Sequence, residues 1–342
     1  MLILRADANS RIGTGHLMRC LALAQSWRAN GGEATFVTNC ESVALRERLK
    51  IEGFVVVEIE NPYTREADWL RAREISQNFS QAWCVVDGYH FDAKFHGLIR
   101  ASGGRVLVVD DTAHLPFYDA DTILNQNINA AELQYNCPPD TRLMLGTKYA
   151  LLRSEFFAWQ DWKRETPEVA RKFLITMGGG DFHNQTLKVI RALGNLKIEN
   201  LKARTVLGAN YSHLPELERV VGESPVHIEL IKSAENMGEL MKWADVAVSA
   251  AGSTCWELAF MQVPSVLIVT AENQISLAAG LSKAAFALNL GWFEQVSQSA
   301  LTVSLSAVSF DRQRRQKMSE TGREIVDGRG AARTVKALRE NA

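Results

Sequence analysis

The chain has 342 residues, of which 46% are hydrophobic and 23% are charged, the proportions of an ordinary globular protein with enough length for two domains. Its 38 basic and 39 acidic side chains give a formal net charge of −1. This balance excludes the positive field of a general nucleic-acid binder, so we expect no nucleic-acid partner. The basic residues after Phe310 are expected to form a solvated helix face: Arg312, Arg314, Arg315, Lys317 and Arg323.

We expect neither a signal peptide nor stable membrane insertion. The N-terminus reaches Arg5 and Asp7 before an apolar core can form. The longest apolar candidate, Leu258–Ala271, is too short to cross a bilayer as a helix. The cysteines are odd in number and scattered, with no C-x-x-C pair, which predicts reduced thiols in a cytoplasmic protein without disulfides or a zinc site: Cys20, Cys40, Cys84, Cys137 and Cys255.

Short β-branched runs alternate with amphipathic patterns through the first half of the chain. The expected strands are Leu2–Arg5, Ala34–Thr38, Val55–Ile59, Cys84–Asp87, Val106–Val109 and Thr122–Leu124. The expected helices are His16–Arg28, Ser42–Lys50, Tyr63–Ser76 and Ala93–Ala101. Continuous apolar strands of this kind are typical of a parallel sheet covered by helices on both faces.

The second half repeats this architecture without repeating the sequence. The expected strands are Phe173–Met177, Ala203–Leu207, His227–Leu230, Val246–Ser249, Ser265–Val269 and Ala287–Leu290, and the expected helices are Asn184–Leu193, Glu235–Trp243, Thr254–Met261 and Ile275–Ala284. The pattern predicts two doubly wound, Rossmann-like α/β domains. We place them at 1–150 and 171–327, with a linker and connecting helix at 151–170. A C-terminal helix at 328–342 follows, and its return to the first domain is left open.

The first segment with a chemical signal is the glycine turn Gly13-Thr14-Gly15-His16, which connects a strand to a helix. Its glycines let a phosphate approach the backbone, and the start of the helix supplies amide donors. Met18 takes the place of the third glycine of the dinucleotide fingerprint, and no P-loop ending follows. The turn places His16 at the ligand-binding edge of a parallel sheet. This favours a general base over a helix-start histidine that bonds a nearby carbonyl.

The second domain has a comparable turn from Ser249 into the next helix, in which Gly252, Ser253 and Thr254 expose amides to an anion. Glu257 is placed to accept hydrogen bonds from a sugar diol. The alternative is a capping box, with Ser253 or Thr254 answered by Glu257.

Two further turns in this domain are candidates for ligand contact. Gly178, Gly179 and Gly180 follow a strand, and three glycines in a row are too costly in conformational entropy to serve only as a connection. Asn273 and Gln274 begin the helix after another strand. His183, just past the glycines, is a candidate for a phosphate or uracil contact.

Together these motifs resemble the nucleotide-sugar hydrolases of pseudaminic acid biosynthesis, which are relatives of the MurG-type GT-B glycosyltransferases. The resemblance covers nearly the whole chain. It is carried by Gly13–Cys20, Val85–Tyr89, Val108–Asp111, Asn125–Asn127, Leu145–Tyr149, Leu152–Arg153, Glu155–Phe156, Thr176–Gly179, Ser253–Glu257, Asn273–Gln274 and Asp327–Ala331. The chain departs from the family pattern at Ala251, Gly88, Gly180 and Phe182, where glycine, histidine, serine and proline are usual.

The resemblance implies a GT-B fold with a cleft between two domains and UDP held mainly by the second. Gly252 and Ser253 would meet the pyrophosphate, Glu257 the ribose and Gln274 the diphosphate-sugar end. It also implies that His16 is the leading catalytic residue, with Tyr89 beside it. The implied reaction is hydrolysis at the anomeric carbon with inversion, which releases UDP and a free 2,4-diacetamido sugar without a metal or another cofactor.

The residues themselves are consistent with this chemistry. UDP is a good leaving group, so donors from the glycine turns suffice to stabilise its departing charge, and His16 suits the remaining need for a base. Asp87 and either Asp110 or Asp111 end strands and are candidates to orient His16, or else they cap the following turns. Tyr89 is placed to bond the sugar or water, or else packs at the edge of the site.

Two alternatives remain open from the sequence, and a third, a metal-dependent transferase, is set aside. A UDP-sugar glycosyltransferase on the same fold needs an acceptor site, and we see no basic, apolar patch for one. A non-catalytic UDP-sugar-binding protein would not need His16. Asp119-Ala120-Asp121 is the D-x-D tripeptide on which a metal-dependent transferase could be argued, but it lies outside the phosphate turns. The oligomeric state and the stereochemistry of the sugar are left open.

Overall fold

The computed structural model describes residues 1–9, 12–59, 74, 82–208, 211–232, 234 and 236–340. The chain divides into two compact units, one made of Met1–Ser154 with Gly328–Ala342 and the other of Glu155–Asp327. The helix expected over Tyr63–Ser76 falls, apart from Glu74, outside the described residues.

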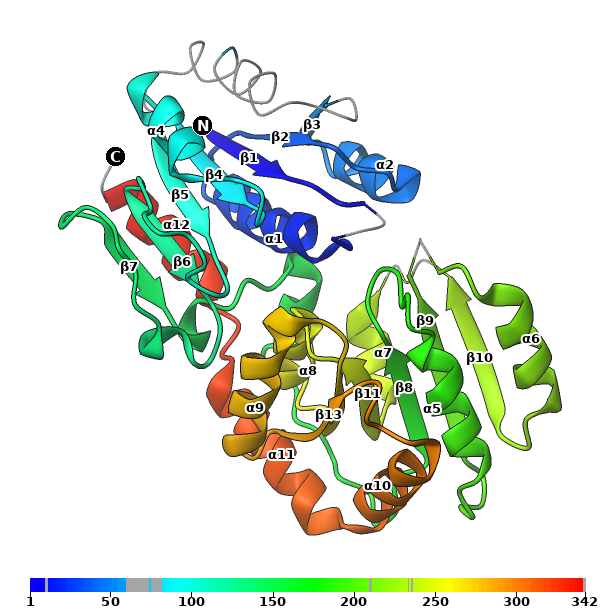
Figure 1. The fold of residues 1–342 in the computed structure, drawn as a ribbon. Helices are drawn as coiled ribbons and strands as arrows, with labels where there is room; N and C mark the ends of the chain where they lie inside the picture. Colours follow the sequence, from blue (N-terminus) through cyan, green and yellow to red (C-terminus); the bar gives the residue numbers. More distant parts are fainter. Residues whose placement is uncertain are drawn as a thin grey trace. The chain divides into compact units, whose positions relative to one another are not determined.

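The N-terminal unit contains, in its described part, a seven-stranded sheet in the order β3-β2-β1-β4-β5-β6-β7 (Figure 1). All neighbouring strands are parallel. The strands are β1 (Leu2–Ala6), β2 (Ala34–Thr38), β3 (Val55–Glu58), β4 (Trp83–Asp87), β5 (Arg105–Val109), β6 (Thr122–Asn125) and β7 (Arg142–Leu145). The sequence did not predict β7. It is an edge strand in which only Met144 is fully buried, so its apolar pattern is too short to recognise.

Helices cover both faces of this sheet. Among the described residues they are α1 (Gly15–Ala29), α2 (Val43–Ile51), α4 (Ala93–Ala101) and α12 (Gly330–Glu340). Because successive side chains of a strand point to opposite faces, Leu4 and Val85 belong to the core shared with α1, α2 and α12, whereas Ile3 and Val86 belong to the core shared with α4. Both faces of the central strands are therefore buried.

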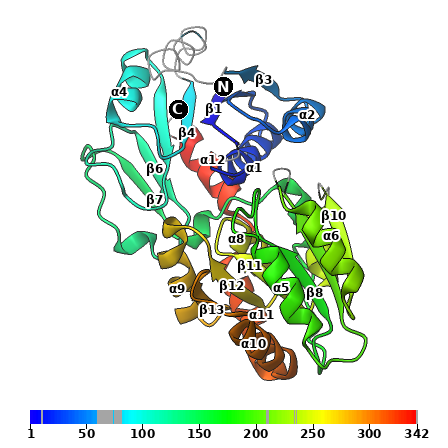
Figure 2. The same cartoon turned by 45° about the vertical axis from the view of Figure 1, so that its right-hand side comes forward.

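The last helix, α12, packs beside α1 and completes the N-terminal unit (Figure 2). The Trp83 indole donates a 3.0 Å hydrogen bond to the Leu338 carbonyl. At the start of the helix, a Cβ on Gly330 would lie 2.1 Å from the Ala150 carbonyl oxygen. Only glycine allows this close approach, so the unit is assembled from two separate segments of the chain.

The C-terminal unit contains, among its described residues, a six-stranded sheet in the order β10-β9-β8-β11-β12-β13, again entirely parallel. The strands are β8 (Lys172–Thr176), β9 (Lys202–Leu207), β10 (His227–Lys232), β11 (Val246–Ala250), β12 (Ser265–Val269) and β13 (Ala287–Trp292). The helices are α5 (Gln185–Gly194), α6 (Leu214–Glu223), α7 (Met237–Trp243), α8 (Thr254–Phe260), α9 (Ile275–Lys283), α10 (Gln298–Phe310) and α11 (Arg312–Ile325). The sequence did not predict α6, in which only Leu217 is buried.

The predicted α/β class with two doubly wound domains is confirmed. In each sheet the strand order reverses beside the first strand of the unit, between β1 and β4 and between β8 and β11. Ligands of doubly wound proteins bind at the carboxyl ends of the strands at such a point.

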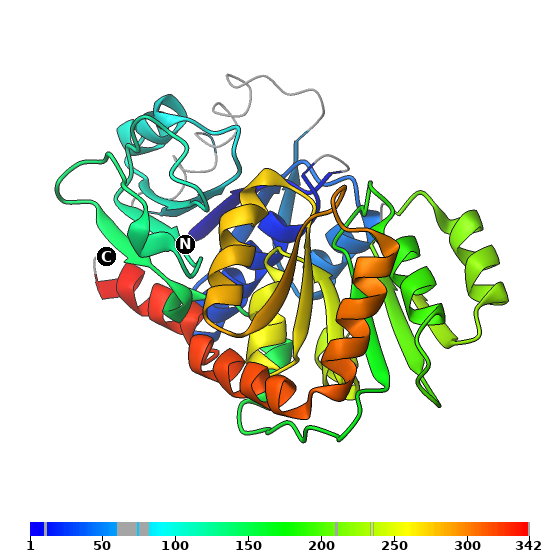
Figure 3. The same ribbon diagram turned by 60° about the horizontal axis from the view of Figure 1, so that its bottom comes forward.

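The basic stretch after Phe310 differs from its prediction. Helices α10 and α11 follow each other at an angle (Figure 3), and Arg315 of α11 is fully buried. Its guanidinium donates to the carbonyls of Val308 at 2.7 Å and Glu168 at 3.1 Å. The prediction of a solvated face is therefore wrong for Arg315, which ties α10 and the segment before β8 together.

None of the helices in the described part of the chain has the length and apolar character needed to span a membrane.

One buried histidine of the N-terminal unit lacks a hydrogen-bond partner in the part of the chain that the structure describes. His96 of α4 is 1% exposed, and neither of its ring nitrogens has a hydrogen-bond partner among the described residues. Burial disfavours the charged imidazolium and lowers the pKa of His96 to about 4. An unfolded histidine titrates near 6.5, so between these two values the unfolded chain binds more protons than the folded one.

This difference predicts that acid destabilises the fold through His96. From pH 7 to pH 5 the histidine should lower the free energy of unfolding by about 2 kcal/mol. Urea denaturation followed by circular dichroism measures the effect: His96→Leu should remove that part of the pH dependence, and the exposed His227→Gln should retain it. If the free energy of unfolding fell equally from pH 7 to pH 5 in the wild type and in His96→Leu, the pH dependence would not come from His96.

Candidate functional site

His16 is the second residue of α1, directly after the glycine turn that follows β1. Gly13 has φ +74°, a conformation that favours glycine. The His16 Nδ1 atom lies 2.5 Å from Oδ1 of Asp87, the last residue of β4. Because Ala6 of β1 and Asp87 of β4 are register partners, adjacent strand ends bring together residues 71 positions apart. The structure thus shows a carboxylate partner for His16, not the carbonyl of the alternative interpretation.

Arg19, one helical turn after His16, binds the same carboxylate. Its Nε lies 2.6 Å from Asp87 Oδ2, and its Nη2 lies 2.7 Å from Oδ1. The sequence alone did not predict Arg19 as part of the site. Its i,i+3 spacing from His16, which puts both residues on one helix face, is the signal that could have found it.

Asp87 is ionised in this environment. Its complete burial would by itself raise the carboxyl pKa, but the charge of Arg19, then the charge that His16 carries when it is protonated, and the hydrogen bonds of both residues lower the pKa of Asp87 to about 2. Because an ionised carboxylate only accepts hydrogen bonds, the proton between the two side chains belongs to His16 Nδ1. In the neutral imidazole, Nε2 is then the nitrogen with the lone pair.

Arg19 also connects this pair to a second carboxylate. Its Nη1 lies 2.8 Å from Oδ1 and 2.9 Å from Oδ2 of Asp111, which follows β5. The Tyr89 hydroxyl donates to Asp111 Oδ2 at 2.9 Å, and the Tyr89 ring meets the His16 ring edge-on at a centroid distance of 5.3 Å. The structure therefore brings His16, Asp87 and Tyr89 together, with Arg19 and Asp111 between them.

Asp110 has a different role from Asp111. It accepts hydrogen bonds from the backbone amides of Thr112 at 2.9 Å and Ala113 at 2.6 Å, and its Oδ1 lies 3.1 Å from Nδ1 of His114. For Asp110, the interpretation of a carboxylate that caps the following turn is confirmed. The hydrogen bond to Asp110 raises the pKa of His114.

In the C-terminal unit, the glycine turn after β8 is packed closely against the end of β9. Gly178 has φ +83°. A Cβ on Gly208, which follows β9, would lie 2.2 Å from the Gly179 carbonyl oxygen, so Gly208 is needed for this turn to keep its position. His183 stacks on Phe293 at a centroid distance of 3.8 Å. The sequence alone did not predict this role of Gly208.

The turn between β11 and α8 is open where the sequence predicts a phosphate. A Cβ on Gly252 would meet no atom within 4 Å. Ser253 occupies the N-cap position of α8 but makes no side-chain capping bond. The capping-box interpretation is therefore wrong for Ser253, since this side chain does not satisfy the helix start. Thr254 begins α8, and Glu257 lies in its first turn.

Asn273 and Gln274 lie in a short 3-10 helix, η4 (Glu272–Gln274), between β12 and α9. The Gln274 side-chain oxygen accepts hydrogen bonds from the Thr270 backbone amide at 2.9 Å and the Thr270 hydroxyl at 3.2 Å. This fixes Gln274 at the carboxyl end of β12, the same edge of the sheet as the turns after β8 and β11.

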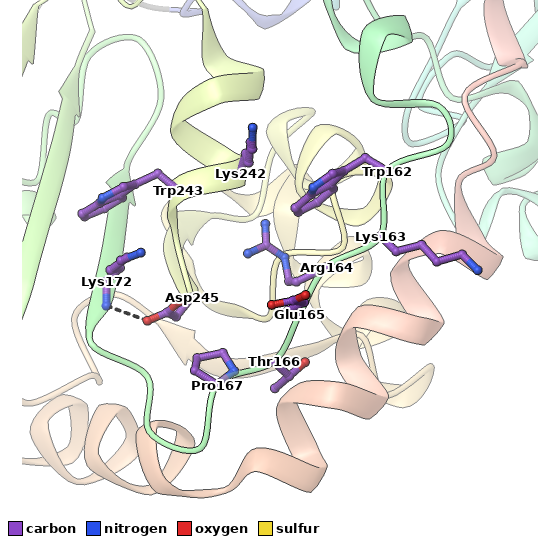
Figure 4. A pocket seen from close by; sticks show the side chains of 10 residues that line it. All are labelled: Trp162, Lys163, Arg164, Glu165, Thr166, Pro167, Lys172, Lys242, Trp243 and Asp245. Atoms are coloured by element: carbon purple, nitrogen blue, oxygen red, sulfur yellow. Dashed lines mark hydrogen bonds between the residues drawn. The ribbon is translucent and has the colours of Figure 1, made fainter.

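A cavity of about 450 Å³ in this unit does not lie at the carboxyl ends of the strands (Figure 4). It is lined by 162–167 and by residues at the amino ends of β8 and β11, Lys172 and Asp245. The Arg164 guanidinium donates to the carbonyl of Met241 at 2.6 Å and to that of Met261. These contacts attach the segment before β8 to the ends of α7 and α8, so we give this region a structural role.

No group of three or more histidine, cysteine, aspartate or glutamate side chains in the described ranges is arranged to hold a metal ion. In the D-x-D tripeptide, Asp119 and Asp121 both pair with Arg100, which lies 3.4 Å from Asp121.

Similarity to known proteins concerns first the fold. Residues 173–329 match the model of the glycosyltransferase family 28 C-terminal domain. The solved structure of MurG from Acinetobacter baumannii superposes with a TM-score of 0.69 over 99% of both chains, at 15% sequence identity. The predicted GT-B-like fold is therefore confirmed.

Relatives with similar sequences indicate which group of GT-B-like proteins this chain resembles. The chain is 27% identical to the UDP-2,4-diacetamido-2,4,6-trideoxy-beta-L-altropyranose hydrolase of Campylobacter jejuni over 290 residues. The aligned region covers 82% of this chain and 96% of the relative. It is 26% identical, over 295 residues, to a Helicobacter pylori protein named as pseudaminic acid cytidylyltransferase and the same hydrolase, which covers 85% of this chain. The predicted resemblance to this group is confirmed.

The share of each relative that the chain covers varies. This chain spans about half the length of two relatives. It covers 50% of the Helicobacter pylori protein and 55% of an uncharacterized protein of Methanocaldococcus jannaschii to which it is also similar.

Proposed function

We propose that this protein hydrolyses a UDP-linked 2,4-diacetamido-2,4,6-trideoxy sugar at the anomeric carbon and releases UDP and the free sugar, as a step of pseudaminic acid biosynthesis. The names of the Campylobacter and Helicobacter relatives support the substrate. The observation that carries the chemistry is the buried pair of His16 and Asp87, joined at 2.5 Å beside Tyr89. This pair supplies a general base at the carboxyl end of a parallel sheet.

In this proposal, His16 Nε2 takes a proton from water while the water oxygen attacks the anomeric carbon. The bond from that carbon to the UDP oxygen breaks, and its electron pair leaves with UDP. Attack opposite the leaving group inverts the configuration. Asp87 holds the tautomer and stabilises the imidazolium that forms, the role of the carboxylate in other histidine–carboxylate pairs.

The C-terminal unit is proposed to bind UDP. Gly252, Ser253 and Thr254 present backbone at the start of α8, where amide groups favour a diphosphate. Glu257 is assigned to the ribose hydroxyls, and Asn273 and Gln274 to the sugar end of the diphosphate. Gly13, Gly15, Gly178 and Gly179 complete the set of proposed substrate contacts. Since these donors stabilise the departing charge, we propose a reaction that needs no metal.

A MurG-type glycosyltransferase is the second candidate, because the fold and the family 28 domain are shared with such enzymes. It would transfer the sugar to an acceptor in place of water. A binding protein without catalysis is the third candidate, and it would tolerate loss of His16.

The hydrolase proposal predicts acceptor-free release of UDP that survives EDTA. His16→Ala should lower kcat by about 10²- to 10⁴-fold, the range of general base catalysis. Coupled detection of UDP released from a panel of UDP-sugars measures the rate. His227→Ala, an exposed histidine at the first position of β10, is the matched control and should retain wild-type turnover.

Other outcomes of this assay separate the candidates. Tight UDP binding without release until an acceptor is added would overturn hydrolysis and favour a transferase. Equal turnover by the wild type and His16→Ala would remove His16 from the mechanism. Loss of activity in EDTA that Mg²⁺ or Mn²⁺ restores would contradict the metal-free step.

Phosphate binding at Gly252 gives a second prediction. Because an added Cβ meets no atom within 4 Å, Gly252→Ala should change the free energy of unfolding by no more than about 0.5 kcal/mol. A methyl group in the path of the pyrophosphate should still weaken UDP binding by at least about tenfold, as measured by calorimetry. Gly222→Ala in α6, equally open, should bind UDP like the wild type. Unchanged UDP affinity in Gly252→Ala would place the pyrophosphate elsewhere.

A further inference from the structure

Asp111 is surrounded by hydrogen-bond donors. Arg19 Nη1 lies 2.8 Å and 2.9 Å from its two carboxylate oxygens, the Asn127 side-chain amide donates to Oδ1 at 3.2 Å, and the Tyr89 hydroxyl lies 2.9 Å from Oδ2. The ion pair with Arg19 requires the ionised form, which accepts hydrogen bonds and cannot donate them. The Tyr89 proton therefore points at Asp111.

A phenol has a single proton. Once that proton is used by Asp111, the Tyr89 oxygen meets any other group only as an acceptor. The direction of this hydrogen bond is thus set by a residue behind Tyr89, before a ligand arrives.

Tyr89 is also the member of this cluster that a ligand reaches most easily. It is 37% exposed, whereas the side chains of Asp111 and Arg19 are 12% and 6% exposed. Its ring lies edge-on between two histidines, with centroid distances of 5.3 Å to His16 and 5.4 Å to His114. The Tyr89 ring therefore lies beside the proposed base, while Asp111 holds its hydroxyl.

We propose that Asp111 makes Tyr89 a dedicated hydrogen-bond acceptor, so that the pair selects substrates that present an N–H or O–H donor next to the reacting carbon. Tyr89 contacts the substrate, and Asp111 acts as a positioning residue through it. This inference rests on the proposed function. It adds a criterion for the sugar: an acetamido N–H or a hydroxyl satisfies the site, whereas a fluorine or a methylated amide at that position does not.

Asp111→Asn should reverse the direction of the bond with little change of shape. Each carboxylate oxygen of Asp111 faces two donors, Arg19 and Asn127 at Oδ1 and Arg19 and Tyr89 at Oδ2. Because the Tyr89 hydroxyl is the one donor that can turn its proton away, the single oxygen of the asparagine should occupy the Oδ1 position and keep Arg19 as a donor there. The new NH₂ group then faces the Tyr89 oxygen and donates to it. Tyr89 must direct its own proton outward, toward the ligand.

The test uses UDP-sugars in which one donor at a time is changed, a hydroxyl to fluorine or an acetamido N–H to N-methyl. The kcat/KM for UDP release is compared for the wild type, Asp111→Asn, Tyr89→Phe and the double variant. Asp119→Asn, a carboxylate of the same unit that pairs with Arg100, is the control. Calorimetry of the same ligands in a His16→Ala background reports affinity without turnover.

At one sugar position, the wild type and Asp119→Asn should prefer the donor by about tenfold. Asp111→Asn should level or invert this preference, and Tyr89→Phe should abolish it. Asp111→Asn should have no further effect on preference in the Tyr89→Phe background. An Asp111→Asn variant that lowers kcat/KM equally for every ligand would overturn the inference and leave Asp111 a purely structural role.

Failure of the proposed function would look different. The wild type would then release UDP from no member of the panel, while the calorimetric preference would still decide the polarity of Tyr89. Identical affinity ratios in the wild type and Asp111→Asn would overturn the inference in that case too.

Discussion

The arrangement of the N-terminal site depends on one buried negative charge, that of Asp87 at the end of β4. With no exposed surface, this carboxylate needs compensation, and Arg19 and His16 supply it from a single helix face. Arg19 extends the network to Asp111, which in turn holds the Tyr89 hydroxyl. Removing one member of such a buried pair typically costs about 3–5 kcal/mol, because the remaining charge is left unpaired. The groups that we propose for catalysis thus also contribute to the stability of the fold.

The two units share one topological feature, the reversal of strand order, but carry different residues at that point. In each sheet the strand order reverses beside the first strand, and loops from adjacent strand ends diverge there to leave room for a ligand. In the N-terminal unit this point carries the buried side chains His16, Arg19 and Asp87. In the C-terminal unit it carries small residues and open backbone around Gly178 and Gly252. In our proposal, side chains provide the chemistry in the first case and backbone amides bind the diphosphate in the second.

The sequence predicted the buried strands well because each is a continuous apolar run, and the observed ends differ by no more than two residues. It missed β7 and α6, which are largely exposed and carry a short apolar pattern.

The glycine turns and His16 could be predicted from local sequence. Two contacts could not. The choice between Asp110 and Asp111 depends on which way consecutive residues turn after β5 ends, and the pairing of Arg19 with both carboxylates depends on the order of strands in the sheet. Burial of Arg315 likewise depends on a packing partner distant in sequence.

The most direct test of the role of Asp87 is the tautomer of His16, read from the ¹⁵N chemical shifts of its ring nitrogens in ¹⁵N-histidine-labelled protein at pH 8. The His16 resonances are assigned by their absence in His16→Ala. The carboxylate at 2.5 Å predicts a protonated Nδ1 and an unprotonated Nε2, with loss of this tautomer preference in Asp87→Asn. A protonated Nε2 in the wild type, or the same tautomer in Asp87→Asn, would contradict the proposal that Asp87 prepares His16 as a base.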